Sequence, residues 1–164
     1  MIIILGPVVL SKIPHGGSLL ADYKIKILFL CTGNSCRSQM AEGLARALKA
    51  DIFDAYSAGT EPRGIDPLAV KAMKEIGIDI SGQSSKHVND LAGVRFDYVI
   101  TLCGDARETC PYFPGKTQRS HAGFDDPPLL AKNARDEEEA MVFYRRVRDE
   151  IEAYIKGLPW SLKL

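Results

Sequence analysis

Apolar runs alternate along the chain with segments in which apolar residues recur every three or four positions. The runs are typical of buried strands, and the spaced segments are typical of amphipathic helices. The expected strands are residues 24–30, 51–59 and 96–103, with a weaker one at 120–125. The expected helices are residues 34–50, 67–77 and 134–158, with a short one within 84–93.

This alternation predicts an α/β fold, with a mostly parallel four-stranded sheet flanked by helices on both faces. Ligands of such sheets bind at the carboxyl ends of the strands. Two expected strands, 24–30 and 96–102, each run directly into a cysteine. We therefore expect Cys31 and Cys103 to lie at the same edge of the sheet.

The composition suits a single domain. The chain has 164 residues, of which 46% are hydrophobic, and this is enough for one ordinary core. Lys plus Arg and Asp plus Glu both number 21, so the net charge gives no reason to expect nucleic acid or an anionic membrane as a partner. Any recognition of an anion must therefore come from a local group of residues rather than from the overall charge of the protein.

Residues 1–23 are expected to be an extension that precedes a domain of residues 24–164. Their apolar run is broken by Gly6 and Pro7 and is too short to span a bilayer, which takes roughly 20 apolar residues. No basic region of a secretory signal precedes it. An added strand or docking arm and an appendage without a role both stay open. We expect a cytoplasmic protein, whose cysteines are kept reduced.

The stretch C-T-G-N-S-C-R-S, residues 31–38, lies where the first expected strand passes into the first expected helix. A short loop at such a junction can turn successive backbone N–H groups towards a tetrahedral oxyanion. Arg37 can donate two hydrogen bonds to this anion. Gly33 is expected to provide a backbone conformation that a side chain would obstruct. The same positive surroundings stabilise a thiolate at Cys31, which makes it a nucleophile.

Two polar residues are expected to support this loop. Ser38 is placed to donate a hydrogen bond to the sulfur of Cys31, and the side-chain amide of Asn34 is expected to brace the backbone. A buried cysteine next to an unrelated arginine is the alternative. That alternative requires no particular spacing, whereas C-x5-R-S between a strand and a helix is a specific pattern and favours the anion-binding loop.

The longer stretch C-T-G-N-S-C-R-S-Q-M-A-E-G resembles the phosphate-binding loop of the low-molecular-weight protein tyrosine phosphatase superfamily. The residues of this stretch are more similar to those of the thioredoxin-coupled arsenate reductases built on that fold. The resemblance covers about residues 24–156. It implies reduction of arsenate to arsenite, and a phosphatase acting on phosphoproteins is the alternative. The loop residues expected to bind the oxyanion are Thr32, Gly33, Asn34, Ser35, Cys36 and Arg37.

The resemblance also implies a relay of three cysteines. Cys31 attacks arsenate, Cys103 attacks Cys31 so that arsenite leaves, and Cys110 then attacks Cys103. Thioredoxin reduces the final disulfide and is the electron donor, so no bound cofactor is expected. The segment from Cys103 to Cys110, which contains Gly104, is expected to carry the disulfide outward. Cys36 is expected to be dispensable.

Other interpretations of the cysteines stay open. A zinc site is disfavoured because six residues separate Cys103 from Cys110, outside the usual two to four. Ordinary buried thiols in a phosphatase are plausible for Cys103, which ends an apolar strand. They are less plausible for Cys110, whose polar, proline-containing surroundings indicate exposure. A protein that binds oxyanions or responds to oxidants without turnover is a third possibility.

The segment H-A-G-F-D-D-P-P, residues 121–128, resembles the part of the reductases that carries an acid–base aspartate. Asp126 is the matching residue and Asp125 the second candidate. Pro127 favours an extended backbone at Asp126, whose carboxyl is expected to help expel hydroxide from arsenate. His121 is expected to form structural hydrogen bonds only.

Some reductases of this family bind a potassium ion behind the loop. The matching positions here are Asn34, Glu42 and Ser57, with Ser84 as a further candidate, but Lys86 stands where those relatives have an aspartate. We expect the ammonium of Lys86 to take the place of the cation and pair with Glu42, so that potassium does not stimulate the protein. A lysine that points into solvent is the alternative. We also expect a monomer without a resident metal.

Overall fold

A computed structural model describes residues 23–108, 110–111, 113 and 115–162 of the chain. The interpretations of residues 1–22 concern a segment outside this range. Among the described residues, no helix is both long and apolar enough to cross a membrane.

Four parallel strands form one sheet in the order β2-β1-β3-β4, which confirms the predicted architecture. The central strand β1 (Ile25–Cys31) contains four consecutive apolar residues, 27–30, that are fully buried. A continuous apolar run is typical of a strand covered on both faces. The other strands are β2 (Phe53–Gly59), β3 (Tyr98–Thr101) and β4 (Gln118–His121).

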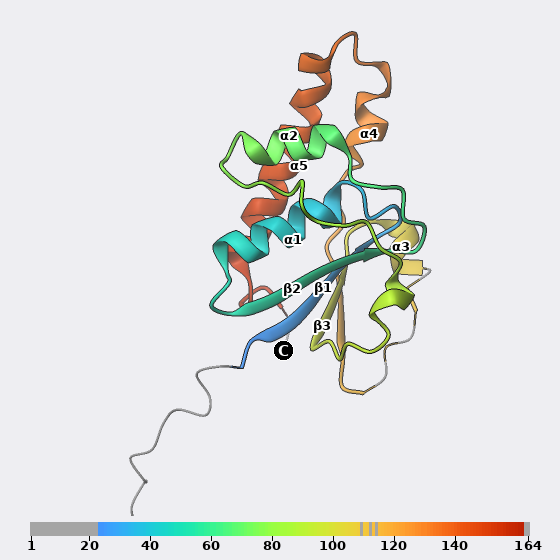
Figure 1. The fold of residues 1–164 in the computed structure, drawn as a ribbon, viewed down its shortest axis with the longest axis vertical. Coiled ribbons are helices and arrows are strands. Elements are labelled where there is room, and N and C mark those ends of the chain that lie inside the picture. The colour runs from blue at the N-terminus through green and yellow to red at the C-terminus, as the bar shows by residue number, and fades with distance from the viewer. Residues whose placement is uncertain (1–22, 109, 112, 114, 163–164) are drawn as a thin grey trace, which may run out of the picture.

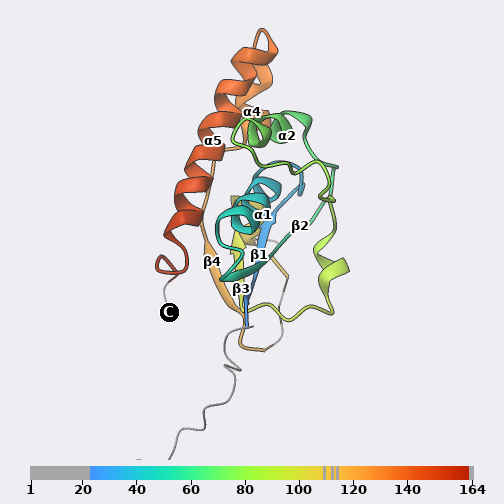
Figure 2. The ribbon, with the colours of Figure 1, turned by 60° about the vertical axis from the view of Figure 1, so that its left-hand side comes forward.

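Helices cover the sheet on both sides. Figure 2 shows α1, α2 and α5 on one side and η1 on the other. The helices of the first side are α1 (Arg37–Leu48), α2 (Pro67–Lys74) and α5 (Glu137–Gly157). The shorter helices are η1 (Val88–Leu91), α3 (Gly104–Glu108), α4 (Pro127–Leu130) and η2 (Ala131–Asn133), and Figure 1 shows α3 at the end of the sheet where β1 and β3 finish.

Local sequence signals explain where α2 and α5 begin, because an aspartate side chain caps the start of each helix. Asp66 caps α2, because its carboxylate accepts hydrogen bonds from two backbone N–H groups of the first turn, and Pro67 follows as the first helical residue. Asp136 caps α5 by accepting from the N–H of Glu139. The long helix packs through Val147, Ile151 and Ile155, which are fully buried and recur every fourth position, whereas Phe143, predicted as the first of this series, is only partly buried.

Several predicted boundaries were wrong: β2 and β3 begin at residues 53 and 98 rather than 51 and 96, α2 ends at 74 rather than 77, and α5 begins at 137 rather than 134. The first helix begins at Arg37 rather than at residue 34, because residues 34–36 belong to a loop. The weak strand predicted at 120–125 is β4, which covers residues 118–121, and the chain after it still donates backbone hydrogen bonds from Ala122 and Phe124 to Thr101 O and Leu102 O. Neither α3 nor α4 was predicted, because helices of five and four residues are too short to show a period.

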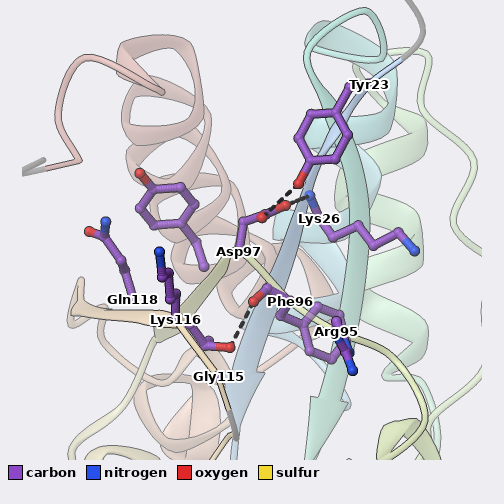
Figure 3. A pocket seen from close by; sticks show the side chains of 10 residues that line it. Tyr23, Lys26, Arg95, Phe96, Asp97, Gly115, Lys116 and Gln118 are labelled. Atoms are coloured by element: carbon purple, nitrogen blue, oxygen red, sulfur yellow. Dashed lines mark hydrogen bonds between the residues drawn. The ribbon is translucent and has the colours of Figure 1, made fainter.

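At the other end of the sheet, Asp97 ties the strands together where they begin (Figure 3). Its carboxylate accepts hydrogen bonds from the backbone N–H of Lys26 and the hydroxyl of Tyr23, both at 2.8 Å. Its own backbone N–H donates to Lys26 O, and its carbonyl accepts from the N–H of Gln118. A cavity of about 770 Å³ opens here, with Arg95 and Lys116 among its lining residues. This region is called the amino-end cavity below.

Candidate active site

The loop between β1 and α1, residues 32–36, is held from outside through its carbonyl groups. Residues 60–66 run beside it and donate three backbone hydrogen bonds to it, and the N–H of Met40 and the side chains of Gln39 and Ser85 donate to it as well. The loop carbonyls are thus engaged by donors outside the loop, an arrangement that suits an anion site built from the N–H groups of the lining residues 32, 33, 35 and 36. The three bonds join Glu61 N to Thr32 O at 2.9 Å, Arg63 N to Gly33 O at 2.9 Å and Asp66 N to Ser35 O at 3.0 Å.

Asn34, rather than Gly33, adopts the unusual backbone conformation of this loop. Asn34 has a φ of 43°, in the left-handed region that asparagine tolerates. Gly33 has no such angle, and a Cβ built on it would meet the side chain of Arg63 at an ordinary distance of 3.6 Å. The expectation for Gly33 was therefore wrong. The glycine that the loop needs is Gly59 of β2, where a Cβ would lie 2.8 Å from the backbone N of Asn34.

The side chain of Asn34 braces the loop, as expected. It is fully buried and donates to the hydroxyls of Ser38 and Ser57, each at 2.9 Å. Its oxygen accepts from the backbone N–H of Lys86 at 2.8 Å. These bonds fasten the loop to α1, to β2 and to the connection before η1.

Cys31 is the last residue of β1, and its sulfur lies 2.9 Å from the hydroxyl oxygen of Ser38. Since that oxygen already accepts a hydrogen bond from Asn34, its own O–H is free to donate to the sulfur. The N-terminus of α1 adds a positive dipole end beside the loop. The geometry expected of Ser38 is thus present.

Arg37 and Asp126 meet across the site. The guanidinium of Arg37, the first residue of α1, lies 3.1 Å from a carboxylate oxygen of Asp126 and donates to Phe124 O at 3.0 Å. Asp126 has an extended backbone before Pro127, as expected. Asp125 is turned away and pairs with Arg146 of α5 at 2.9 Å. Of the two candidate aspartates, the structure brings only Asp126 to the loop.

His121 stays outside the reacting groups. Its Nδ1 lies 2.8 Å from the hydroxyl oxygen of Thr101 on the neighbouring strand β3. This contact fits the structural role expected of the residue.

The loop encloses a cavity of about 340 Å³, which is called the loop cavity below. None of its described lining residues is aromatic, and five of them carry charged side chains. Sequence reasoning missed three of the five, although the D-P pair at positions 66–67 is a recognisable helix start. The charged lining residues are Arg37, Arg63, Asp66, Asp105 and Asp126.

Cys103 lies at the same site as Cys31. It follows β3 by two residues and is 8% exposed, and its sulfur lies 3.4 Å from the hydroxyl oxygen of Thr32 in the loop. The prediction that the two strands deliver both cysteines to one edge of the sheet is confirmed. The helix α3 begins at the next residue, Gly104, and leads towards Cys110.

Cys110 is partly buried, so the exposure predicted for it was wrong. It packs against the core, and burial raises the pKa of its thiol. Its sulfur contacts the carbonyl oxygen of Pro111 at 3.7 Å. All four cysteines are free thiols.

Cys36 is 4% exposed at the start of α1. Burial, helped by the nearby carboxylate of Asp66, raises the pKa of this thiol well above its ordinary value. It is therefore protonated at neutral pH. Among the residues that the structure describes, no three His, Cys, Asp or Glu side chains are grouped as a metal site.

Behind the loop, the buried carboxylate of Glu42 faces two cations. The ammonium of Lys86 lies 3.8 Å from it and also donates to Ser84 O at 3.0 Å. Arg46, one helical turn further along α1, forms a closer ion pair at 2.6 Å, and Ser57 donates to the same carboxylate. Lys86 is thus turned towards Glu42 rather than into solvent. The contribution of Arg46 was missed, although the i,i+4 spacing of Glu and Arg on a helix signals it.

The family model for low molecular weight phosphotyrosine protein phosphatases matches residues 26–163, and the chain belongs to this family. An arsenate reductase of Halalkalibacterium halodurans is 54% identical to it over 130 residues, which cover 79% of this chain and 91% of that protein. A solved arsenate reductase in a phosphate-binding state is 30% identical, with a TM-score of 0.66, and the match covers 85% of this chain and 99% of that one. A thioredoxin-dependent arsenate reductase of Corynebacterium glutamicum is 27% identical, with a TM-score of 0.62, over 84% of this chain and 60% of that one.

Proposed function

We propose that the protein reduces arsenate to arsenite and that thioredoxin returns it to the dithiol state. The observation that carries this proposal is the placement of a second thiol, Cys103, beside the loop that begins at Cys31. A phosphatase of this fold needs one nucleophilic thiol, whereas a two-electron reduction needs a second sulfur within reach. The relatives named arsenate reductase support the choice of substrate.

The substrate is held as a tetrahedral oxyanion by the N–H groups of residues 32–37 and by the guanidinium of Arg37. Arg37 is held by Asp126 and Phe124 O, and it is therefore oriented before substrate arrives. The sulfur of Cys31 attacks arsenic, an S–As bond forms and one As–O bond breaks. Asp126 takes up the proton that the Cys31 thiol loses on attack and passes it to the departing oxygen, which leaves as water.

Reduction takes place in the next step. The thiolate of Cys103 attacks the sulfur of Cys31, and the S–As bond breaks with its electron pair remaining on arsenic. Arsenic passes from the pentavalent to the trivalent state, arsenite leaves, and a Cys31–Cys103 disulfide forms. Thr32 contacts the sulfur of Cys103 and is placed to orient it for this attack.

Cys110 then takes over the disulfide by attacking Cys103 and releasing Cys31. The five-residue helix α3 lies between the two cysteines, so the transfer relies on rearrangement of this short segment. The rearranged segment presents the disulfide to thioredoxin, and the cytoplasm is the compartment that suits this donor.

A tyrosine phosphatase remains the second candidate because the loop, Arg37 and Asp126 also suit a phosphate ester. The absence of aromatic side chains among the described residues of the loop cavity disfavours a phosphotyrosine ring there. Hydrolysis of an aryl phosphate by itself decides nothing, because a reductase with this loop can retain it.

The deciding experiment follows arsenate-dependent oxidation of NADPH in the presence of thioredoxin and thioredoxin reductase. The wild-type protein is expected to turn over continuously, and Cys110→Ser is expected to stop after about one arsenite per molecule, because the first disulfide then persists. The matched control, Cys36→Ser, is expected to turn over like the wild type. Brisk aryl phosphate hydrolysis without any arsenate-dependent oxidation would assign the protein to the phosphatases.

A further inference from the structure

Arg63 reaches the anion site from the connection between β2 and α2. Its backbone N–H donates to Gly33 O, and the stem of its side chain lies over Gly33. The residue lines the loop cavity, yet 66% of its side chain is exposed. The guanidinium is therefore at the mouth of the cavity rather than on its floor, where Cys31 lies.

The lining of the loop cavity holds a second arginine besides Arg37. Arg37 and Asp126 form an ion pair at 3.1 Å and offset each other. Arg63 is the remaining cation among the described lining residues, and it is the more exposed of the two arginines. A positive side chain at this place attracts an anion that enters the cavity.

The anchoring of Arg63 keeps its charge at this place. The same hydrogen bond that holds the loop carbonyl of Gly33 fixes the backbone of Arg63, so the guanidinium moves only by side-chain rotation. Glu61 lies two residues earlier, and its carboxylate is 3.1 Å from the guanidinium. An exposed ion pair of this kind is weak, so a doubly charged oxyanion can compete with Glu61 for Arg63.

We propose that Arg63 captures the oxyanion at the mouth of the cavity and passes it to Arg37 and the loop, with Glu61 as the group that the anion displaces. The proposal rests on the proposed function for the identity of the anion, arsenate. It makes Arg63 a residue for substrate entry, distinct from the groups that carry out the reaction.

The first test compares kcat/KM for arsenate at low and high ionic strength. Arg63→Gln is expected to lower kcat/KM about 5- to 10-fold in low salt, to leave kcat within about twofold, and to lose most of its effect at about 0.5 M salt. Arg63→Lys is expected to retain most of the wild-type value, since it keeps the charge. Glu61→Gln is expected to raise kcat/KM slightly. Arg95→Gln, which removes the same charge from the amino-end cavity, is the matched control and is expected to behave like the wild type.

The second test uses binding without turnover. The rate at which iodoacetamide alkylates Cys31 is measured against increasing arsenate, and half-protection is expected to need several-fold more arsenate in Arg63→Gln than in the wild type or in Arg95→Gln. If the wild type is protected but never reduces arsenate, the proposed function fails while the role of Arg63 stands. Unchanged protection together with an unchanged kcat/KM at low salt overturns the role of Arg63. A loss confined to kcat also overturns it, because that result indicates a distorted loop.

Discussion

The two ends of the sheet both carry a cavity, and the larger one lies away from the loop. The amino-end cavity has a volume of about 770 Å³ against about 340 Å³ for the loop cavity. At the amino end, both carboxylate oxygens of Asp97 are used to hold Tyr23 and Lys26, so its polar groups keep the strands in register (Figure 3). At the carboxyl end, the backbone is held from outside and the reactive groups are left to face the cavity. The functional site is therefore identified by polar and reactive side chains that point into one cavity and are not needed to hold the fold together, rather than by the volume of the cavity.

The strongest test of this comparison removes the nucleophile at the carboxyl end. Cys31→Ser is expected to lower the rate of arsenate reduction by at least about a thousandfold, because a serine hydroxyl is not ionised beside Ser38 and cannot enter a disulfide. Coupled NADPH oxidation measures the rate, and circular dichroism checks that the fold is intact. Retention of more than about a tenth of the activity would contradict the assignment of Cys31.

A second test separates two neighbouring aspartates at the same end. Asp126→Asn is expected to lower kcat about 10- to 100-fold, because an amide keeps the contact with Arg37 but cannot give a proton to the departing oxygen. Steady-state kinetics with saturating arsenate measure the effect. Asp125→Asn is the matched control, since Asp125 binds Arg146 on the surface, and it is expected to stay within about twofold of the wild type. Equal losses in both variants would remove Asp126 from the reaction.

The sequence predicted the groups at the carboxyl end better than it predicted how they are held. Cys31, Arg37 and Ser38 are close in the chain, so a strand followed by a helix nearly determines their arrangement. Cys103 followed from the rule that parallel strands end at one edge. Residues 60–66 carry no local signal of their contact with the loop, because hydrogen bonds between backbone groups depend on position rather than on residue type. The partial burial of Cys110 also depends on tertiary packing against the core, which its polar, proline-containing neighbours in the sequence do not signal.

The amino end offers the opposite test, in which stability changes and catalysis does not. Asp97→Asn removes one of the two acceptor oxygens of the carboxylate and is expected to lower the free energy of unfolding by about 1–2 kcal/mol. Denaturant unfolding measures this loss, and kcat/KM for arsenate is expected to remain within about twofold of the wild type. A large kinetic defect without a loss of stability would show that this end of the molecule takes part in the reaction.

The smallest effect is expected from the cation site behind the loop. The carboxylate of Glu42 already faces the guanidinium of Arg46 and the ammonium of Lys86, so a potassium ion would have to enter beside two positive charges. Turnover is therefore expected to differ by less than about 1.5-fold between potassium and sodium chloride at equal ionic strength, since the two salts screen exposed charges equally. The same comparison in Lys86→Gln, which removes one charge and keeps a polar side chain, shows whether the lysine is responsible. A several-fold stimulation of the wild type by potassium would mean that Lys86 moves aside. The loop of residues 32–36 would then be supported by a bound ion rather than by the lysine of the chain itself.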